Sequence, residues 1–235
     1  MTATKASRTA ILVAAITTLG TTDVRFGCDF SGSMDNMMKK IGAEGTGSAA
    51  MTTRLNVLQD TGRATIKAIM PYDSNGITLT FFGKDHKTVD NVTSENFDAT
   101  WKQGQTVDRT GTILAPVLTE MFEAALKDSA TKQQCLFIFT DGEPKDKDAV
   151  VQVLTKYSND DRVKDGRVGI GFIQIGNADG VGEFLASLDT ALQAKYDITS
   201  RTTIEQFAIL DLDHQVGYTM AGSHDPAEYE QPVAA

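Results

Sequence analysis

Cysteine, histidine and positive charge are all scarce in this chain of 235 residues. It has two cysteines, three histidines, and 22 basic against 31 acidic residues, which gives a formal net charge of −9. No basic stripe is present to neutralise phosphates, and this argues against a nucleic-acid partner. The histidines, His86, His214 and His224, are scattered without the spacing of metal ligands. The composition suits a soluble protein that meets basic or metal-bridged partners.

Long apolar runs are also missing. The stretch over residues 10–19 is too short to span a bilayer, so we expect no membrane anchor. It follows Lys5 and Arg8 as a secretory leader would, but no Ala-x-Ala-like cleavage site follows it. We favour an added strand or helix that packs on the domain, with a leader as the alternative. Cys28 and Cys135 lie in apolar segments, where a free cysteine behaves as a small hydrophobe. Nothing points to an oxidising compartment, and a cytoplasmic location is expected.

The chain has an ordinary globular composition, with 41% hydrophobic and 23% charged residues. Its length and its single strand–helix rhythm predict one domain over residues 22–212, with an N-terminal extension (1–21) and a polar C-terminal tail (213–235). Strands are predicted over residues 24–28, 77–82, 87–92, 135–140 and 168–175, and from residue 196. Helices are predicted over residues 34–41, 54–70, 94–102, 113–127, 146–157, 182–193 and 203–210, with a flexible loop over 42–53 and Trp101 half-buried.

The most informative segment is Asp29-Phe30-Ser31-Gly32-Ser33, directly after the first apolar strand. Side chains two apart on an extended chain point the same way, so Asp29, Ser31 and Ser33 can converge on one ion. Hard oxygen donors of low total charge suit Mg²⁺ or Mn²⁺ rather than Zn²⁺. The same residue types also crowd ordinary turns, so a plain turn is the alternative for this segment alone.

Two later segments supply matching pieces. Residues 110–118 read Thr-Gly-Thr-Ile-Leu-Ala-Pro-Val-Leu, a small-residue loop that runs into a helical pattern. Residues 136–143 read Leu-Phe-Ile-Phe-Thr-Asp-Gly-Glu, an apolar strand that ends in Thr-Asp-Gly. Together with the first segment, they resemble the von Willebrand factor type A (vWA) domain, and the resemblance extends over residues 22–210. That family carries a metal-ion-dependent adhesion site built from Asp-x-Ser-x-Ser, a threonine in a Gly-Thr loop, and an aspartate after a later strand.

The resemblance implies a site for Mg²⁺ or Mn²⁺ formed by Asp29, Ser31, Ser33, Thr112 and Asp141. Thr112 is preferred to Thr110, because it fills the last place of the family's Gly-Gly-Thr pattern and Thr110 stands where the first glycine would be. Whether either aspartate binds the metal directly or through water stays open.

The family's fold is α/β and doubly wound, with a mostly parallel central sheet of strand order 3-2-1-4-5-6 and helices on both faces. The residues agree with it independently, because Asp29 and Asp141 each follow a predicted central strand and ligands bind at the carboxyl ends of such strands. In that sheet Cys28 and Cys135 would lie on neighbouring strands but about 16 Å apart along them, so no disulfide is expected.

The resemblance implies a non-enzymatic module that binds a partner protein's Asp or Glu carboxylate through the metal. The alternative is a structural subunit of a larger assembly, in which the metal only stiffens loops. The acidic tail, with Asp225, Glu228 and Glu230, could then supply a carboxylate to another copy. Enzymatic activity is not expected, because the chain has no Gly-x-x-x-x-Gly-Lys loop, no Ser-His-Asp or Cys-His signature, and no second carboxylate at position 31.

Overall fold

The computed structural model describes residues 19–43, 50–129, 131–164, 166–176, 181–190, 192 and 194–220. Six strands of this part form one sheet in the order β5-β4-β1-β6-β7-β8. Their bounds are Thr22–Asp29 (β1), Ile77–Phe82 (β4), His86–Val92 (β5), Gln133–Thr140 (β6), Val168–Gln174 (β7) and Thr199–Thr203 (β8). Numbered along the chain within this sheet alone, the order is 3-2-1-4-5-6. The labels run differently because β2 and β3 belong to a separate two-stranded sheet.

All neighbouring strands of the large sheet are parallel except the edge strand β5, which runs antiparallel to β4. The central strand β6 is buried at all but its first residue. A strand covered on both faces has this continuous apolar character, whereas a half-exposed strand alternates. The predicted doubly wound, mostly parallel α/β fold is therefore confirmed.

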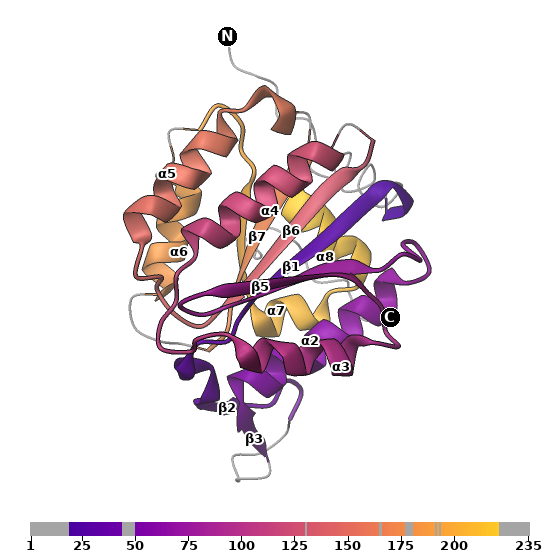
Figure 1. Ribbon diagram of the computed structural model, residues 1–235, viewed down its shortest axis with the longest axis vertical. Helices are drawn as coiled ribbons and strands as arrows, with labels where there is room; N and C mark the ends of the chain where they lie inside the picture. Colours follow the sequence, from indigo (N-terminus) through magenta and orange to yellow (C-terminus); the bar gives the residue numbers. More distant parts are fainter. Residues whose placement is uncertain are drawn as a thin grey trace, which may run out of the picture.

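Helices cover both faces of the sheet, as Figure 1 shows. Side chains from α2 (Arg54–Ile69), α3 (Phe97–Trp101), α7 (Ile204–Ile209) and α8 (Leu212–Met220) share one hydrophobic core. Those from α4 (Ala115–Asp128), α5 (Lys147–Ser158) and α6 (Val181–Thr190) share the other. Short 3₁₀ turns are η1 (Leu19–Thr21), η2 (Gly32–Asp35), η4 (Lys102–Thr106) and η5 (Asp161–Val163). No described helix combines the length and apolar character that a membrane span requires.

The helix expected over residues 34–41 is wrong. The 3₁₀ turn η2 ends at Asp35, and residues Met37–Lys39 form strand β2, which pairs antiparallel with β3 (Met51–Thr53). The backbone at Asn36 is already extended, with φ −62° and ψ 144°, so the chain leaves the helical region there. The expected loop over 42–53 therefore ends in a strand, and residues 44–49 lie outside the described part.

The polar tail expected from residue 213 is also wrong for residues 213–220. These belong to α8, where Val216 and Tyr218 are buried. Gly169 of β7 allows the helix to lie close, because a Cβ there would sit 2.7 Å from the Thr219 carbonyl oxygen. Trp101, expected to be half-buried, is only 4% exposed, since Phe30, Phe81 and Phe97 surround it. The N-terminal apolar stretch up to residue 18 and the acidic residues of the tail lie outside the described residues.

Cys28 and Cys135 are free and buried, as expected. In the β1–β6 register Cys28 lies opposite Phe139, and Cys135 lies opposite Val24. The two cysteines are thus four residues apart along neighbouring strands, about 13 Å, which is slightly less than the sequence suggested. That separation still excludes a disulfide without backbone movement.

Candidate metal centre

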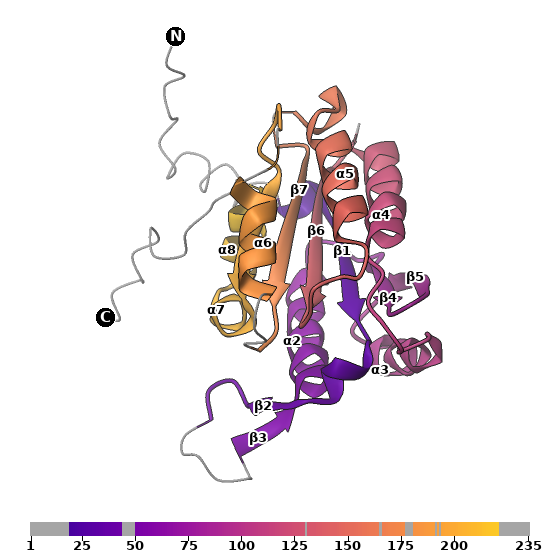
Figure 2. The same cartoon turned by 90° about the vertical axis from the view of Figure 1, so that its left-hand side faces the viewer.

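The predicted site residues lie at the carboxyl ends of the two central strands. Asp29 is the last residue of β1, and Asp141 follows the last residue of β6. Because Cys28 lies opposite Phe139, the parallel register brings both strand ends to the same edge of the sheet. Figure 2 shows the ends of β1 and β6 at this edge, with the β2–β3 hairpin projecting from the same end of the molecule.

A chain of hydrogen bonds links four of the five predicted ligands. The Ser31 backbone N–H donates to Asp29 Oδ1 at 2.8 Å. The Ser31 and Ser33 hydroxyl oxygens are 3.0 Å apart, and the Ser33 hydroxyl donates to Asp141 Oδ1 at 2.7 Å. The structure thus brings together two loops whose linked residues are 108 positions apart in the sequence.

The donor set fits a hard divalent cation. Its side-chain atoms are carboxylate and hydroxyl oxygens, which Mg²⁺ and Mn²⁺ prefer. Adjacent ligands of an octahedral Mg²⁺, with bonds of about 2.1 Å, are about 3.0 Å apart. The oxygens of Ser31 and Ser33 have this 3.0 Å separation. Within the described residues, no three His, Cys, Asp or Glu side chains gather into a metal cluster, so any cation here would depend on hydroxyl ligands.

Thr112 lies in the loop between η4 and α4, and this loop is tied to both of the others. The Gly32 N–H donates to the Arg109 carbonyl oxygen at 2.8 Å, on the side of the first loop. The Lys145 N–H donates to the Thr112 carbonyl oxygen at 2.9 Å, on the side of the Asp141 loop. The backbone of Thr112 is thereby anchored between the segments that carry the other four residues.

The two threonines of this loop are distinguished by their surroundings. Thr112 is buried, with 6% exposure, and its hydroxyl takes no part in the hydrogen-bond chain of the other four residues. Thr110 is exposed, and its hydroxyl already donates to Asp108 Oδ1 at 2.6 Å. The arrangement therefore favours Thr112 as the ligand from this loop.

Burial and charge set the chemistry of the site. Asp29, Ser31 and Asp141 are at most 3% exposed, whereas Ser33 is exposed and opens the site to solvent. Burial raises the pKa of Asp29 to about 6, and the neighbouring charge of Asp141 acts in the same direction. Hydrogen bonds to Asp29 from Ser31 and Thr140 oppose this rise. A cation bound beside Asp29 would lower this pKa and so favour the ionised form of the side chain.

Comparisons with known proteins agree on the fold. No protein-family model and no curated protein matches the sequence. Among solved structures, the manganese-loaded TRAP protein of Plasmodium vivax aligns with a TM-score of 0.51 and 16% identity, over 81% of this chain and 72% of that one. The chain has the vWA fold. The PilB minor pilin of Streptococcus sanguinis aligns with a TM-score of 0.52 and 13% identity, and a point mutant of it with 0.53 and 12%. Each pilin alignment covers 85% of this chain but only 59% of the pilin chain.

Sequence reasoning missed one charged residue at the centre of this candidate site. Arg54, the first residue of α2, donates from Nη1 to Asp141 Oδ2 at 2.6 Å. Its side chain is 13% exposed, and that of Asp141 is fully buried. The position of Arg54 in the sequence was a signal that could have been used. A positive charge at a helix N-terminus is unfavourable beside the helix macrodipole, so it indicates an acidic partner elsewhere in the fold. Thr140 was also missed: its hydroxyl donates to Asp29 Oδ2 at 2.7 Å, although it was read only as a strand residue.

Other polar residues hold the three loops to one another. Asp146 accepts hydrogen bonds from the Leu114 and Ala115 N–H groups, at 3.0 and 2.8 Å, and so caps α4. Asp35, in the first turn of η2, pairs with Arg109 at 2.7 Å. Arg109 also donates from Nε to the Phe30 carbonyl oxygen at 2.6 Å, next to Asp29.

Two charged residues closely follow the Thr-Asp-Gly corner and contact other residues of the chain. Glu143 forms an ion pair with Lys147, four residues on. The Lys145 ammonium donates to the Thr110 carbonyl oxygen at 3.0 Å, across the neighbouring loop. Both groups are thus engaged by other residues of this chain.

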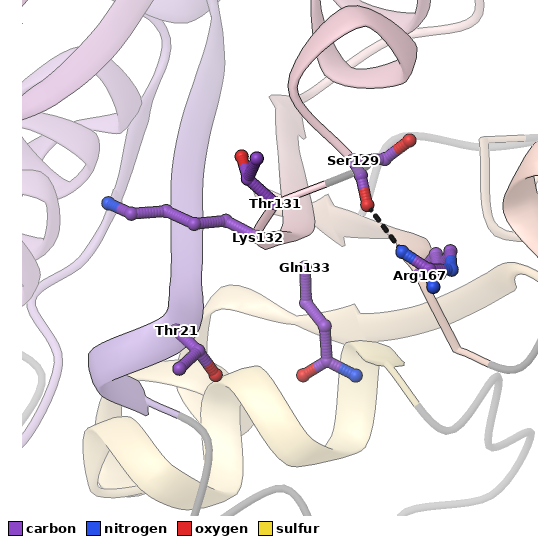
Figure 3. A pocket seen from close by; sticks show the side chains of 6 residues that line it. All are labelled: Thr21, Ser129, Thr131, Lys132, Gln133 and Arg167. Atoms are coloured by element: carbon purple, nitrogen blue, oxygen red, sulfur yellow. Dashed lines mark hydrogen bonds between the residues drawn. The ribbon is translucent and has the colours of Figure 1, made fainter.

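A surface hollow of about 270 Å³ lies away from this site, near the amino ends of β1 and β6, and Figure 3 shows its lining. The Arg167 guanidinium donates to the Ser129 carbonyl oxygen at 2.8 Å. Lys132 points away from Arg167 in this view and pairs with Asp23 at 2.7 Å. The two positively charged side chains that line the hollow, Lys132 and Arg167, therefore already have partners. The hollow is separate from the metal centre.

Proposed function

We propose that this chain is a non-enzymatic protein-binding module whose adhesion site holds Mg²⁺ or Mn²⁺. The metal ligands are Asp29, Ser31, Ser33, Thr112 and Asp141. The partner is a protein that supplies an Asp or Glu carboxylate. The hydrogen-bond chain from Asp29 through the two serines to Asp141 carries this proposal, because it gathers hard oxygens at one strand edge.

The residues have separate tasks in this proposal. The buried carboxylates of Asp29 and Asp141 supply the negative charge. The hydroxyls of Ser31, Ser33 and Thr112 add neutral oxygens. Three neutral ligands would leave a bound cation electron-poor, and the cation would then accept an anionic oxygen from outside. Ser33, the exposed member, marks the side from which a carboxylate would approach. The manganese in the similarly folded TRAP protein supports a divalent cation here.

An enzymatic role is not favoured by the surroundings. The two histidines in the described part, His86 and His214, lie on β5 and α8 and are bonded to Glu120 and Asp211. Neither hydrogen bond involves one of the five site residues, so neither histidine joins them as a general base. A role in partner recognition needs only the five site residues and no general base.

The second candidate is a structural subunit of a larger assembly, in which the metal only stiffens the loops. The similarity of the fold to that of a minor pilin is the reason to consider this second role. Metal dependence separates the two roles: a partner captured through the site is lost in EDTA, whereas a structural association is not.

A pull-down from the native lysate tests the proposal. We expect the wild-type chain to retain a partner with Mn²⁺, to release it in EDTA, and to recover it when Mn²⁺ is restored. Asp29→Asn should fail to capture it. Asp60→Asn is a matched control, because Asp60 is an exposed carboxylate paired with Arg63 on α2. Capture that resists EDTA and persists in Asp29→Asn would contradict the module. EDTA-resistant self-association, lost when residues 222–235 are removed, would support the structural subunit.

A further inference from the structure

Arg54 carries a positive charge that would oppose a metal, and it is bonded directly to the side chain of a predicted ligand. Its guanidinium donates to Asp141 Oδ2 at 2.6 Å, while Ser33 donates to Asp141 Oδ1 at 2.7 Å. The Asp141 side chain is fully buried, so this ion pair is shielded from solvent. Charges interact more strongly in such a setting than at the surface, because screening by water is reduced.

The Nε atom of Arg54 is held by packing rather than by a hydrogen bond to the described residues. Arg54 Nε is buried, and it has no hydrogen-bond partner within the described part of the chain. It lies against Gly176, just past the end of β7, where a Cβ would sit 2.7 Å from Nε. The glycine thus leaves a slot that the arginine fills. A buried donor without a partner costs stability, so the ion pair with Asp141 is what keeps Arg54 there.

Arg109 and Lys145 are bonded to backbone carbonyl oxygens of the neighbouring loops, so the charge balance is counted here over the side chains of Asp29, Asp141 and Arg54 alone. Asp29 and Asp141, when ionised, carry two negative charges, and Arg54 cancels one of them. A divalent cation would turn the remaining single negative charge into a single positive one. A partner carboxylate would bring the total to zero. Without Arg54, the cation alone would already neutralise the two aspartates.

We infer that Arg54 is a built-in counter-charge that weakens metal binding by the free domain and couples tight metal binding to an incoming carboxylate. This inference rests on the proposed function, and it assigns to Arg54 the regulation of the same site. Because the coupling is reciprocal, the metal also strengthens carboxylate binding by the same factor. The domain would hold its cation firmly only when a partner is bound.

Calorimetric titration with Mn²⁺, alone and in excess acetate as a carboxylate probe, tests this inference. Arg54→Gln should bind Mn²⁺ alone roughly tenfold more tightly or better, as removing a like charge within several ångströms implies. Acetate should strengthen Mn²⁺ binding by the wild type more than by Arg54→Gln. Arg63→Gln is the matched control, because Arg63 is an exposed arginine on the same helix with its own ion pairs. Arg54→Lys keeps the charge and should stay close to the wild type.

Loss of the ion pair also leaves Asp141 unpaired, so metal-free Arg54→Gln should melt at a lower temperature and regain stability with Mn²⁺. If it is too unstable to titrate, the Mn²⁺ concentration that restores half of its folding gives the affinity instead. Unchanged or weaker Mn²⁺ binding by Arg54→Gln would overturn the inference. Asp29→Asn in the same series separates the two claims: if it loses Mn²⁺, the metal site stands even when the role of Arg54 fails. If it binds Mn²⁺ like the wild type, the site and the inference both fail.

Discussion

The Thr140 hydroxyl donates a 2.7 Å hydrogen bond to Asp29 Oδ2, across 111 positions of sequence. It joins the ends of the two central strands just beneath the candidate metal site. Together with the Ser31 N–H on Oδ1, it gives each carboxylate oxygen of Asp29 a donor. The side chain is thus fixed before any cation arrives, yet it remains a buried charge.

This burial predicts that the metal-free protein loses stability as the pH rises. Asp29 ionises near its ordinary value of 3.8 when unfolded, but its pKa in the folded protein is raised to about 6. Between these values the folded state holds a proton that the unfolded state has released. Stability should therefore fall between about pH 4 and pH 6, by up to about 3 kcal/mol. Urea unfolding in EDTA at several pH values measures the change.

The Asn variant is the control for this pH dependence. Asp29→Asn cannot ionise, so its free energy of unfolding should lack this fall, and the wild type should lose stability relative to the variant as the pH rises toward 7. A wild-type-minus-variant difference that stays constant from pH 4 to pH 7 would show that Asp29 does not titrate in this way.

Metal binding should show the opposite trend with pH. A proton on Asp29 competes with a cation, so Mn²⁺ affinity should fall as the pH drops below about 6, by up to about tenfold per unit from this group alone. Calorimetry at pH 5, 6 and 7 checks this. An affinity that does not change over this range would contradict the prediction that protonation of Asp29 competes with the metal.

The choice between the two threonines leads to a separate test. Thr112→Ala and Asp29→Ala should each abolish or strongly weaken Mg²⁺ and Mn²⁺ binding while the far-UV circular dichroism stays unchanged. Thr110→Ala is the matched control, and it should retain the wild-type affinity because its hydroxyl is bonded to Asp108. The reverse result for the two threonine variants would transfer the ligand role to Thr110.

Asp146 should matter for stability and, through the loop that it holds, for the metal. Both of its carboxylate oxygens accept N–H groups at the start of α4, two and three residues after Thr112. Asp146→Ala should cost about 1–2 kcal/mol, as loss of a helix N-cap does, and should weaken Mn²⁺ binding. Asp148→Ala removes an exposed charge in the first turn of α5 and should change each quantity far less. Equal effects of the two substitutions would argue against the capping role.

The sheet, and the proximity of four of the five predicted site residues, were within reach of the sequence for physical reasons. Apolar strands that alternate with amphipathic helices favour a parallel sheet, and the carboxyl ends of such strands meet at one edge. Two motifs placed just after β1 and β6 therefore had to converge, and the hydrogen bonds between Ser31, Ser33 and Asp141 show that they do. The hydroxyl of Thr112 lies outside this chain of hydrogen bonds. Metal binding by all five residues stays a prediction.

The remaining features depend on contacts that a local pattern does not contain. Met34 and Met38 are spaced four apart, as on a helix, but Met38 is held by strand pairing with Thr52. The segment over α8 looked polar, yet Gly169 lets it pack closely on β7. Arg54 looked like an ordinary helix residue, and its partner Asp141 is 87 positions away in sequence.

A crystal grown with Mn²⁺ tests the central claim most directly. We expect an anomalous-difference peak within about 2.3 Å of the Ser31 and Ser33 hydroxyl oxygens, with Thr112 on the same ion. A Mn²⁺-saturated crystal with no peak between these residues, or with its ion bound elsewhere on the chain, would contradict the account.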